Sequence, residues 1–514
     1  MADDLILTID NGTQSVRALA FDLKGNLIAK AAVKLDGYTS AQPGWMEHDV
    51  DGFWQAMSAA CRALWDQGIV APAQMRGLVI TTQRASLINL DAQGQPLRPA
   101  IIWADQRRTD EPPEMALKWK LLFGTLRLTK TIHAFAAEAE SRWIAQNQPE
   151  IWAHTDKFLL LSGYLNYRFT GRFADGIGSQ VGYIPFDYRK MRWADASDWK
   201  WQVLGIPPEM LPELVEAGGL ISTVSAQASV DTGIPEGLPV IAGASDKACE
   251  VLGSGALSPE IGAVSCGTSA TINIMSKRYV EALPFVPPYP AAIPGMYNTE
   301  VQVMRGYWMV SWFAKQFGLI EQQRGREAGQ PPEAYFDALI ESTPPGAEGL
   351  ILQPFWNPGV REPGPEARGS VIGFTDTHTR AHLYRAIIEG LGYALREGRD
   401  RLQKRSKVPI TSLRVAGGGS QSDAVLQIIA DMFNLPATRP SLYEASGLGA
   451  AMIGAVGLGL HPDFATAAKA MTSAGRTFEP ISANAAHYDR IYRKVYSRLY
   501  RQLKPLFDEL KAIA

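Results

Sequence analysis

The sequence predicts an α/β protein of two domains, and three observations support this prediction. Segments with strand patterns alternate with segments of helical periodicity, which is typical of α/β folds. The 514 residues exceed what one hydrophobic core usually supports, so two domains of roughly 250 residues each are expected. An apolar strand, Gly-Thr, a polar residue and a second strand occur near the start of the chain and again at residues 261–279. We therefore expect domains at residues 1–252 and 253–514, each starting close to a Gly-Thr hairpin.

The first domain is expected to open as a β-meander. Residues 5–35 alternate apolar and polar side chains in three short runs, broken at Asp10–Gly12 and at Lys24–Asn26. Asn-Gly and Gly-Asn pairs tolerate the positive φ of tight hairpins, so both breaks predict turns. Further along, the pattern predicts a helix, two strands and a helix-rich region. These lie at residues 50–68, 77–82, 86–91 and 110–168, in that order.

The second half continues the alternation. A buried strand is expected at 238–242, and a Pro/Gly-rich loop at 354–374 precedes an amphipathic helix at 380–403. Three glycines, 417–419, lie between a strand and a helix at 424–433. Residues 445–460 are rich in small apolar side chains but are fewer than the ~20 apolar residues that cross a bilayer. Close packing in a core is the expected role of this last segment.

Composition excludes several functional classes. The formal net charge is −2 and no basic block is present, which argues against a nucleic-acid partner. The three cysteines, Cys61, Cys249 and Cys266, are not at metal-ligand spacing, which indicates a reducing compartment and no zinc site. The start, MADDLILTID, carries two acids and enters a strand pattern directly, so we expect no targeting peptide. A cytoplasmic protein without a membrane partner is expected.

The two hairpins carry candidate phosphate contacts. Backbone N–H groups of a Gly-Thr turn can point into a concavity that suits a phosphate, and the hydroxyls of Thr13 and Thr268 add donors. Arg17, two residues beyond Ser15, adds a planar and permanently charged donor. Asp10, at the end of the incoming strand, is a hard oxygen ligand of the kind that Mg²⁺ takes, often through water. The alternative is that Asp10 forms an Asx-turn that shapes the hairpin.

A lone carboxylate, Asp246, follows the apolar run at 238–242 in the sequence GASDKACEVLG. It can cap a helix that starts at Lys247. It can also accept a proton, because a carboxylate with an ordinary pKa near ~4 is ionised at neutral pH. The glycines at 417–419 match neither a Walker A loop nor a dinucleotide fingerprint. They either let a ribose or a flat ring approach the backbone or form a plain strand-to-helix turn.

Taken together, Asp10 with its hairpin, Asp246, the second hairpin and the triple glycine resemble, in order and spacing, the FGGY carbohydrate kinases, the family of glycerol kinase and xylulokinase. The resemblance covers residues 5–459. IDNGTQSVRALAFDLKGNLIA (9–29) is similar to the opening phosphate hairpin of the family, and GWMEHDVDGFW (44–54) and RPAIIWADQR (98–107) are similar to its sugar-side segments. Residues 369–397 resemble the second family signature, apart from Phe374, where a smaller aliphatic residue is usual.

The resemblance implies an actin-like, ribonuclease H-like fold of two α/β domains with the active site in the cleft between them, and it implies ATP and Mg²⁺ as cofactors. By the same resemblance, Asp246 is the general base that takes the proton of the sugar hydroxyl, and Asp10 and Asp246 help to hold Mg²⁺. The implied phosphate contacts are Gly12, Thr13, Gln14, Arg17, Gly267 and Thr268. The implied adenosine contacts are Gly418, Gly419 and Ser422.

The acceptor implied by the resemblance is a small sugar or polyol. Gln83 and Arg84 match the glycerol kinase pattern, but Ala85 stands where that pattern has a glutamate, and the Met-His pair of bacterial xylulokinases is absent. Trp103 is expected to wall the sugar carbons, with Gln83, Arg84 and Asp105 as polar partners. A ketopentose such as xylulose or ribulose is the favoured class, and glycerol or a tetritol is the alternative. His133, Phe135, Ser179 and Gln180 are further candidates for the pocket lining.

Other classes of protein remain as alternatives. A non-kinase actin-like ATPase would share the phosphate hairpins but lack the sugar-side segments at 44–54 and 98–107, which this chain has. A catalytically silent sugar sensor would have no physical need to keep both Asp10 and Asp246. The sequence favours a carbohydrate kinase, a phosphotransferase with an alcohol acceptor. It leaves a homodimer open beside a monomer.

Overall fold

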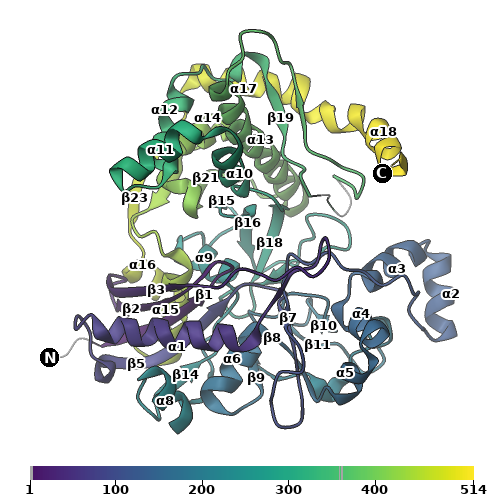
Figure 1. Ribbon diagram of the computed structural model, residues 1–514, viewed down its shortest axis with the longest axis vertical. Helices are drawn as coiled ribbons and strands as arrows, with labels where there is room; N and C mark the ends of the chain where they lie inside the picture. The colour runs from purple at the N-terminus through teal and green to yellow at the C-terminus, as the bar shows by residue number, and fades with distance from the viewer. Residues whose placement is uncertain (1–3, 358, 360–362, 514) are drawn as a thin grey trace. The chain divides into compact units, whose positions relative to one another are not determined.

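A mixed β-sheet that starts from a hairpin lies at the centre of the first half of the chain, in the computed structural model (Figure 1). Residues 4–357, 359 and 363–513 are described. Three strands form the predicted meander, and the first of them, β1, also pairs in parallel with β5, which in turn pairs in parallel with β14. The sheet order is β13-β14-β5-β1-β2-β3. Its strands are β1 (Leu5–Asn11), β2 (Ser15–Asp22), β3 (Leu27–Lys34), β5 (Met75–Thr82), β13 (Leu220–Thr223) and β14 (Pro239–Ile241).

The second half of the chain builds a sheet with the same pairing pattern. The hairpin β15–β16 is antiparallel, β15 pairs in parallel with β21, β21 pairs in parallel with β22, and β23 is the antiparallel edge. The order is β17-β18-β16-β15-β21-β22-β23, with β17 (Tyr289–Pro290) at the other edge. The strands are β15 (Ile261–Cys266), β16 (Ala270–Ser276), β18 (Tyr297–Val303), β21 (Ser412–Ala416), β22 (Ala437–Pro440) and β23 (Ala474–Phe478). The prediction that the Gly-Thr hairpin starts a sheet in each half is confirmed.

The two halves form two compact units, but the chain returns twice to the first. The first unit contains the chain up to Gly253, together with Tyr289–Tyr297 and Ser446–Thr472, and the rest forms the second. The division predicted at residue 252 assigned both returning segments to the second domain, and the structure differs there. The reason is packing. Gly447 lies against Leu19 of β2, and Gly449 lies so close to the carbonyl of Cys249 that a Cβ would be 2.0 Å from its oxygen.

Helices cover both faces of the first sheet. Leu5, Leu7 and Ile9 of β1 share a core with α1 (Val50–Asp66) and α6 (Leu161–Thr170). The alternate face carries Ile6, which lies against Gly454 of α15 (Ala445–Gly457). The small residues of 445–460 therefore allow close packing on a sheet, as predicted, because side chains alternate between the faces of a strand. Among the described residues, no helix is long and apolar enough to cross a membrane.

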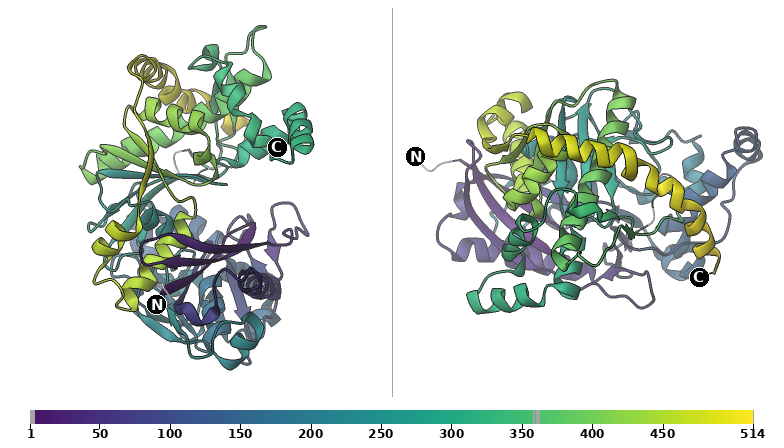
Figure 2. Two further views of the ribbon diagram at one scale, coloured as in Figure 1. Left: turned by 90° about the vertical axis from the view of Figure 1, so that its left-hand side faces the viewer. Right: turned by 90° about the horizontal axis from the view of Figure 1, so that it is seen from above.

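The second unit is built around the predicted amphipathic helix, observed as α13 (Arg380–Ser406), which packs on α14 (Asp423–Phe433) and on β16. The helix ends where Lys407 adopts a left-handed φ of 63°. The C-terminal helix α18 (Ser497–Ile513), yellow in Figure 2, follows α17 (Ser482–Ile491) along this unit. One expectation differs. The loop predicted at 354–374 includes β20 (Ser370–Ile372), because its β-branched residues pair with β19 (Ile351–Gln353). Residues 358 and 360–362 of that loop lie outside the described part of the chain.

A smaller sheet in the first unit carries the two sugar-side segments. Its order is β4-β7-β6-β8, and its strands are β4 (Glu47–His48), β6 (Leu87–Leu90), β7 (Ala100–Ile101) and β8 (Lys157–Leu160). The strand predicted at 86–91 is β6. The helix-rich region predicted at 110–168 contains five helices and one strand, β8, in the structure. The helices are α2 (Leu117–Thr125), α3 (Thr129–Ala137), α4 (Glu140–Asn147), α5 (Pro149–His154) and α6.

Candidate functional site

The carboxyl ends of three neighbouring parallel strands bring the main candidate residues of the first unit together. In the register of the sheet, Asn11 of β1 lies beside Thr82 of β5, and Ile241 of β14 lies beside Val79. At these ends, the Gln83 N–H donates to the Asn11 carbonyl (2.9 Å), and the Thr81 hydroxyl donates to the carbonyl of Ala244 (2.8 Å). Ligands of α/β sheets bind outside the carboxyl ends of such strands. This edge is therefore the candidate site.

The hairpin at the end of β1 places Arg17 opposite Asp10. The two residues are direct partners in the β1–β2 register, and Arg17 Nη1 donates to Asp10 Oδ2 at 3.0 Å. The Asp10 side chain is only 5% exposed, whereas that of Arg17 is 32% exposed. A charge-assisted bond of this kind fixes the carboxylate and leaves much of the guanidinium accessible. The turn itself is closed by the Gly12 N–H, which donates to the Ser15 carbonyl (3.1 Å).

Thr13, in the same turn, is tied to the sugar-side residues. Trp103 Nε1 donates to Thr13 Oγ1 (3.1 Å), and Thr13 Oγ1 donates to Gln83 Oε1 (3.2 Å). The phenol of Tyr38 donates to the Thr13 carbonyl. Burial raises the pKa of Tyr38 to about 12, so this phenol stays protonated and acts as a donor at neutral pH. Tyr38 was not predicted from the sequence, because an aromatic residue after a strand carries no signal of its partner.

Asp246 is the first residue of α9 (Asp246–Gly253), as expected for a residue at a strand-to-helix junction. The cap, however, is Ser245, whose Oγ accepts from the Ala248 N–H (3.4 Å), while Asp246 Oδ1 accepts from the N–H of Lys247 (2.7 Å). Burial raises the pKa of Asp246, and the charges of Lys247 and Arg84 offset part of this effect. The ordinary pKa that the sequence predicts for Asp246 is therefore too low, since a sequence carries no information on desolvation.

The two sugar-side segments are joined by charged groups. The Asp105 carboxylate accepts three bonds from Arg107, at 2.8, 2.8 and 2.7 Å, and one from the Met46 N–H at 2.6 Å. Arg107 also pairs with Glu47 (2.9 Å), and its guanidinium lies over the ring of Trp45 (4.2 Å). These bonds hold residues 98–107 against residues 44–54. A direct bond from Asp105 to a sugar hydroxyl stays a prediction.

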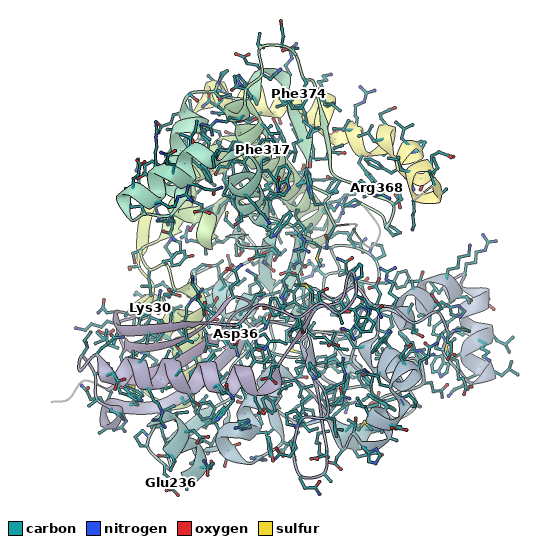
Figure 3. All side chains as sticks on the ribbon, viewed as in Figure 1. Lys30, Asp36, Glu236, Phe317, Arg368 and Phe374 are labelled. Atoms are coloured by element: carbon teal, nitrogen blue, oxygen red, sulfur yellow. The ribbon has the colours of Figure 1, made fainter. Side chains whose placement is uncertain are left out.

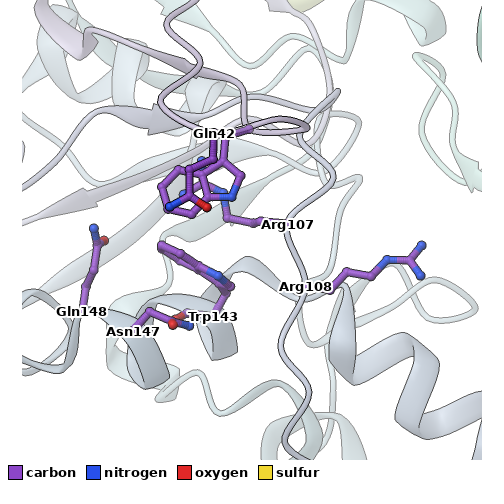
Figure 4. Close-up of a pocket in the computed structure, with 7 residues that line it drawn as sticks. Gln42, Arg107, Arg108, Trp143, Asn147 and Gln148 are labelled. Carbon is purple, nitrogen blue, oxygen red and sulfur yellow. The ribbon is translucent and has the colours of Figure 1, made fainter. Parts of the chain in front are cut away.

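A pocket of about 500 Å³ lies beside these segments, with Arg107 in its wall (Figure 4). Its other lining residues are Gln42, Trp45, Arg108, Trp143, Asn147 and Gln148. In Figure 4 the Arg108 side chain points away from the others. The charge of Arg107 is already neutralised by Asp105 and Glu47, so this arginine orders the wall of the pocket and leaves little positive charge for an anion.

The remaining sugar-side candidates differ in what they contact. Gln180 Nε2 donates to the buried carboxylate of Asp175 (2.8 Å), whose pKa burial raises to about 7. Phe135 packs edge-on against Tyr183 (5.2 Å). Ser179 is buried, and His133 is half-buried. None of these observations assigns a ligand contact, and the four residues stay predictions.

In the second unit, the triple glycine packs against the second hairpin. Gly417 has a φ of 83°, and a Cβ on it would lie 2.9 Å from the Cys266 nitrogen. A Cβ on Gly419 would lie 2.5 Å from the ring of Tyr307. A Cβ on Gly418 would meet no atom closer than 3.6 Å, which leaves this backbone open to a ligand. Glycine is thus required at 417 and 419 by close packing.

Three other candidates of this unit already make hydrogen bonds within it. The Thr268 carbonyl accepts from the Trp308 N–H (3.3 Å), and the Gly267 carbonyl accepts from the Tyr307 N–H (3.0 Å). Ser422 caps α14, because its Oγ accepts from the Val425 N–H (3.0 Å). The nucleotide contacts implied for these three residues stay predictions.

Comparisons with known proteins cover both units. The family described as "FGGY family of carbohydrate kinases, N-terminal domain" matches residues 5–253, and its C-terminal domain matches residues 262–458. The chain is 31% identical over 504 residues to the "Uncharacterized sugar kinase YgcE" of Escherichia coli, covering 97% of this chain and 94% of that protein. It is 28% identical to the xylulose kinase of Lactococcus lactis, covering 98% of each chain. The crystal structure of xylulose kinase from Rhodospirillum rubrum superposes with a TM-score of 0.80 at 26% identity, covering 98% of this chain and 100% of that one.

Proposed function

The chain belongs to the FGGY family of carbohydrate kinases and is an ATP-using sugar kinase of actin-like fold, and we propose that it phosphorylates a hydroxyl of a ketopentose. The observation that carries the assignment of the site is that Asp10, Arg84 and Asp246 come from the carboxyl ends of the neighbouring strands β1, β5 and β14, where the charge of Arg84 acts on Asp246. Asp10 lies in β1 itself, Arg84 follows the end of β5, and Asp246 starts the helix that follows β14. Phosphoryl transfer depends mainly on positioning and charge neutralisation, which such an edge supplies.

Asp246 is the proposed general base. Its carboxylate accepts the proton of the acceptor hydroxyl as that oxygen bonds to the γ-phosphorus of ATP, and the bond from phosphorus to the β,γ-bridging oxygen breaks to release ADP. Arg84 supplies positive charge near Asp246, since it partly offsets the rise in the pKa of this acid. Arg17, together with the turn at Gly12–Gln14, contacts the phosphates. Gln83 and Trp103 border the acceptor.

The carboxylates at this edge fit a Mg²⁺ ion whose other ligands are the phosphates of a bound nucleotide and water. The described residues contain no cluster of three or more His, Cys, Asp or Glu side chains that could hold a metal alone. Mg²⁺ is usually bound through one or two carboxylates plus substrate phosphates and water. Asp10, at the end of β1, and Asp246, beyond the end of β14, provide two such carboxylates. When bound, the ion neutralises charge on the phosphates.

The second unit is proposed to contact the nucleotide. Gly267 and Thr268 lie in its Gly-Thr hairpin, which has the same antiparallel pairing as the hairpin that carries Thr13. Gly418 offers open backbone next to this hairpin, and a flat ring or a ribose can approach a residue without a side chain. Gly419 and Ser422 contribute to the same proposed adenosine contact.

The ketopentose is supported by the relatives named xylulose kinase and by the sugar-side segments. A glycerol kinase of Halorhodospira halophila, 27% identical, keeps glycerol or a tetritol as the alternative. An ADP-release screen with Mg²⁺, ATP and a panel of pentuloses, hexuloses, tetritols and glycerol tests the proposal. Highest kcat/KM on a pentulose supports it, and highest kcat/KM on glycerol or a tetritol assigns the alternative. Absence of turnover on every compound would favour a silent sensor.

The pH dependence of turnover tests the base. Because only the deprotonated base accepts a proton and the pKa of Asp246 is raised, kcat/KM should fall on acidification at a pH above the ordinary Asp value of about 3.9. Activity is thus kept above the raised pKa and lost below it. Initial rates across the acidic limb measure this, with enzyme stability checked at each pH. An acidic limb at or below the ordinary value contradicts the assignment.

Arg17→Ala tests the phosphate hairpin. Loss of a phosphate donor should raise the apparent KM for ATP by more than the KM for the sugar, by roughly tenfold for an interaction of about 1.4 kcal/mol. Steady-state kinetics with each substrate varied in turn measures the split. Arg76→Ala, at an exposed arginine of β5 in the same sheet, is the matched control and should leave both constants unchanged. A larger rise in the sugar KM would place Arg17 in the acceptor pocket.

A further inference from the structure

We propose that Tyr289 is a positioning residue that holds the Arg84 guanidinium in place for the acceptor, as one link in a closed ring of contacts. The inference rests on the proposed function and extends it to a residue far away in the sequence. The ring runs from Arg84 through Tyr289, Tyr188 and Gly182 to Ala85, which returns to Arg84 along the chain. All five residues belong to the first unit.

The backbone forms one side of the ring. Ala85 has a left-handed φ of 50°, which is uncommon for a residue with a side chain, and its N–H donates to the Val181 carbonyl (3.1 Å). A Cβ on the neighbouring Gly182 would lie 3.7 Å from Ala85. Residues kept in sparsely populated backbone conformations cluster at functional sites, where the surrounding structure over-determines them. The contact of Ala85 with residues 181–182 therefore fixes the direction of the chain next to Arg84.

Aromatic rings form the other side. The guanidinium carbon of Arg84 lies 5.2 Å from the centroid of the Tyr289 ring, within the range of a cation–π contact. Tyr289 meets Tyr188 edge to face at 5.9 Å. The Tyr188 hydroxyl lies 3.4 Å from both the N–H and the carbonyl oxygen of Gly182, which completes the ring. The Arg84 side chain is thus contacted by Tyr289, while the backbone of the next residue, Ala85, is held by residues 181–182.

Tyr289 reaches this position because its segment returns to the first unit. Within residues 289–297, the Ala291 N–H donates to the Met296 carbonyl (3.0 Å), and the Tyr297 hydroxyl donates to the Arg189 carbonyl (2.8 Å). The segment is therefore closed by its own hydrogen bond and attached to Arg189, the residue that follows Tyr188. The second half of the chain in this way contributes to the sugar side of the first unit.

The functional consequence follows from the flexibility of arginine. An arginine side chain loses considerable rotamer entropy when a ligand fixes it. When the Arg84 guanidinium already lies over the Tyr289 ring, this entropy is lost before the acceptor binds. Replacing the aromatic ring of Tyr289 by an aliphatic side chain should therefore weaken binding of the acceptor, with a smaller effect on binding of ATP. The ring face provides the contact, so phenylalanine should replace tyrosine and leucine should not.

The test compares Tyr289→Leu with Tyr289→Phe. Tyr289→Leu should raise the acceptor KM about tenfold, equivalent to about 1.4 kcal/mol, with little change in the ATP KM or in kcat. Tyr289→Phe should restore near-normal values. In an Arg84→Ala background, Tyr289→Leu should add little, because the two residues then lack the contact they share. An unchanged acceptor KM in Tyr289→Leu, or additive effects of the two substitutions, would overturn the proposal.

A second measurement does not depend on turnover. The arginine reagent phenylglyoxal is applied to each protein, and labelling of Arg84 is followed by peptide mass spectrometry relative to the exposed Arg76. Labelling of Arg84 should be several-fold faster in Tyr289→Leu than in the wild type and unchanged in Tyr289→Phe. Equal labelling rates in all three proteins would overturn the proposal that Tyr289 holds Arg84. If the wild type phosphorylates no compound of the panel, the proposed ketopentose function fails. The labelling rates still test whether Tyr289 holds Arg84.

Discussion

Asp246→Asn is expected to lower kcat by roughly 10²- to 10⁴-fold, the usual contribution of a positioned acid or base. Asparagine keeps the size of the side chain and can still approach the Lys247 N–H, but it cannot accept the hydroxyl proton. The fold should persist, since the helix cap is Ser245, whose Oγ accepts from the Ala248 N–H (3.4 Å). Sugar-dependent ADP release measures kcat, and ATP binding measured by calorimetry should stay near the wild-type value.

Glu250→Gln is the matched control for this variant. Glu250 lies one turn further along α9 and pairs with Lys247 at 3.4 Å, so it reports the effect of neutralising an acid on the same helix. Its kcat should remain near normal. Turnover of Asp246→Asn within a few-fold of the wild type would remove Asp246 from the role of base. A similar loss in both variants would point to the charge of the helix start as the cause.

Asp10→Asn is expected to have the second largest effect. Asp10 is expected to hold the ion through water, and loss of such an outer partner typically costs roughly 10- to 100-fold in metal affinity or activity. The Mg²⁺ concentration needed for half-maximal turnover should rise accordingly, and excess Mg²⁺ should recover part of kcat. Arg17 would also lose its partner at 3.0 Å, so the ATP KM should be measured in the same series.

Asp36→Asn controls for the loss of one negative charge near the hairpin. Asp36 is an exposed residue just beyond β3, labelled in Figure 3, and its substitution should leave the Mg²⁺ dependence unchanged. Thermal denaturation of both variants checks the fold. An unchanged Mg²⁺ dependence in Asp10→Asn would favour the Asx-turn as the role of Asp10, because the residue would then shape the hairpin only.

The departure from the family pattern at Phe374 lies on the surface of the second unit. The side chain is 59% exposed in the second unit and meets His378 edge to face at 5.9 Å (Figure 3). A larger residue is tolerated there because solvent-exposed positions have few packing constraints. In contrast, Ala85 combines a small side chain with a φ of 50° beside Arg84. Of the two departures, Ala85 is the one adjacent to Arg84, the residue proposed to meet the acceptor.

Local chemistry explains which elements could be predicted. The meander at residues 5–35 follows from alternation and from two turn pairs that tolerate positive φ, and all of these signals lie within a few residues of each other. The helix at 380–403 follows from its periodicity, and the repeated Gly-Thr hairpin predicts a sheet in each half. The strand β20 was missed because its pairing with β19 is not visible in its own sequence. The raised pKa of Asp246 depends on burial and could not be predicted either.

The sequence by itself determined the family, the two sheets and the chemical types at Asp10, Arg17 and Asp246, because short-range patterns and side-chain identities carry that information. Only the tertiary structure decided which partners these residues have. It returned residues 289–297 and 446–472 to the first unit, joined Asp105 to Met46, and placed Tyr289 under Arg84. The physical reason is that such contacts join residues far apart along the chain, and close packing and burial select them only once the sheets have formed.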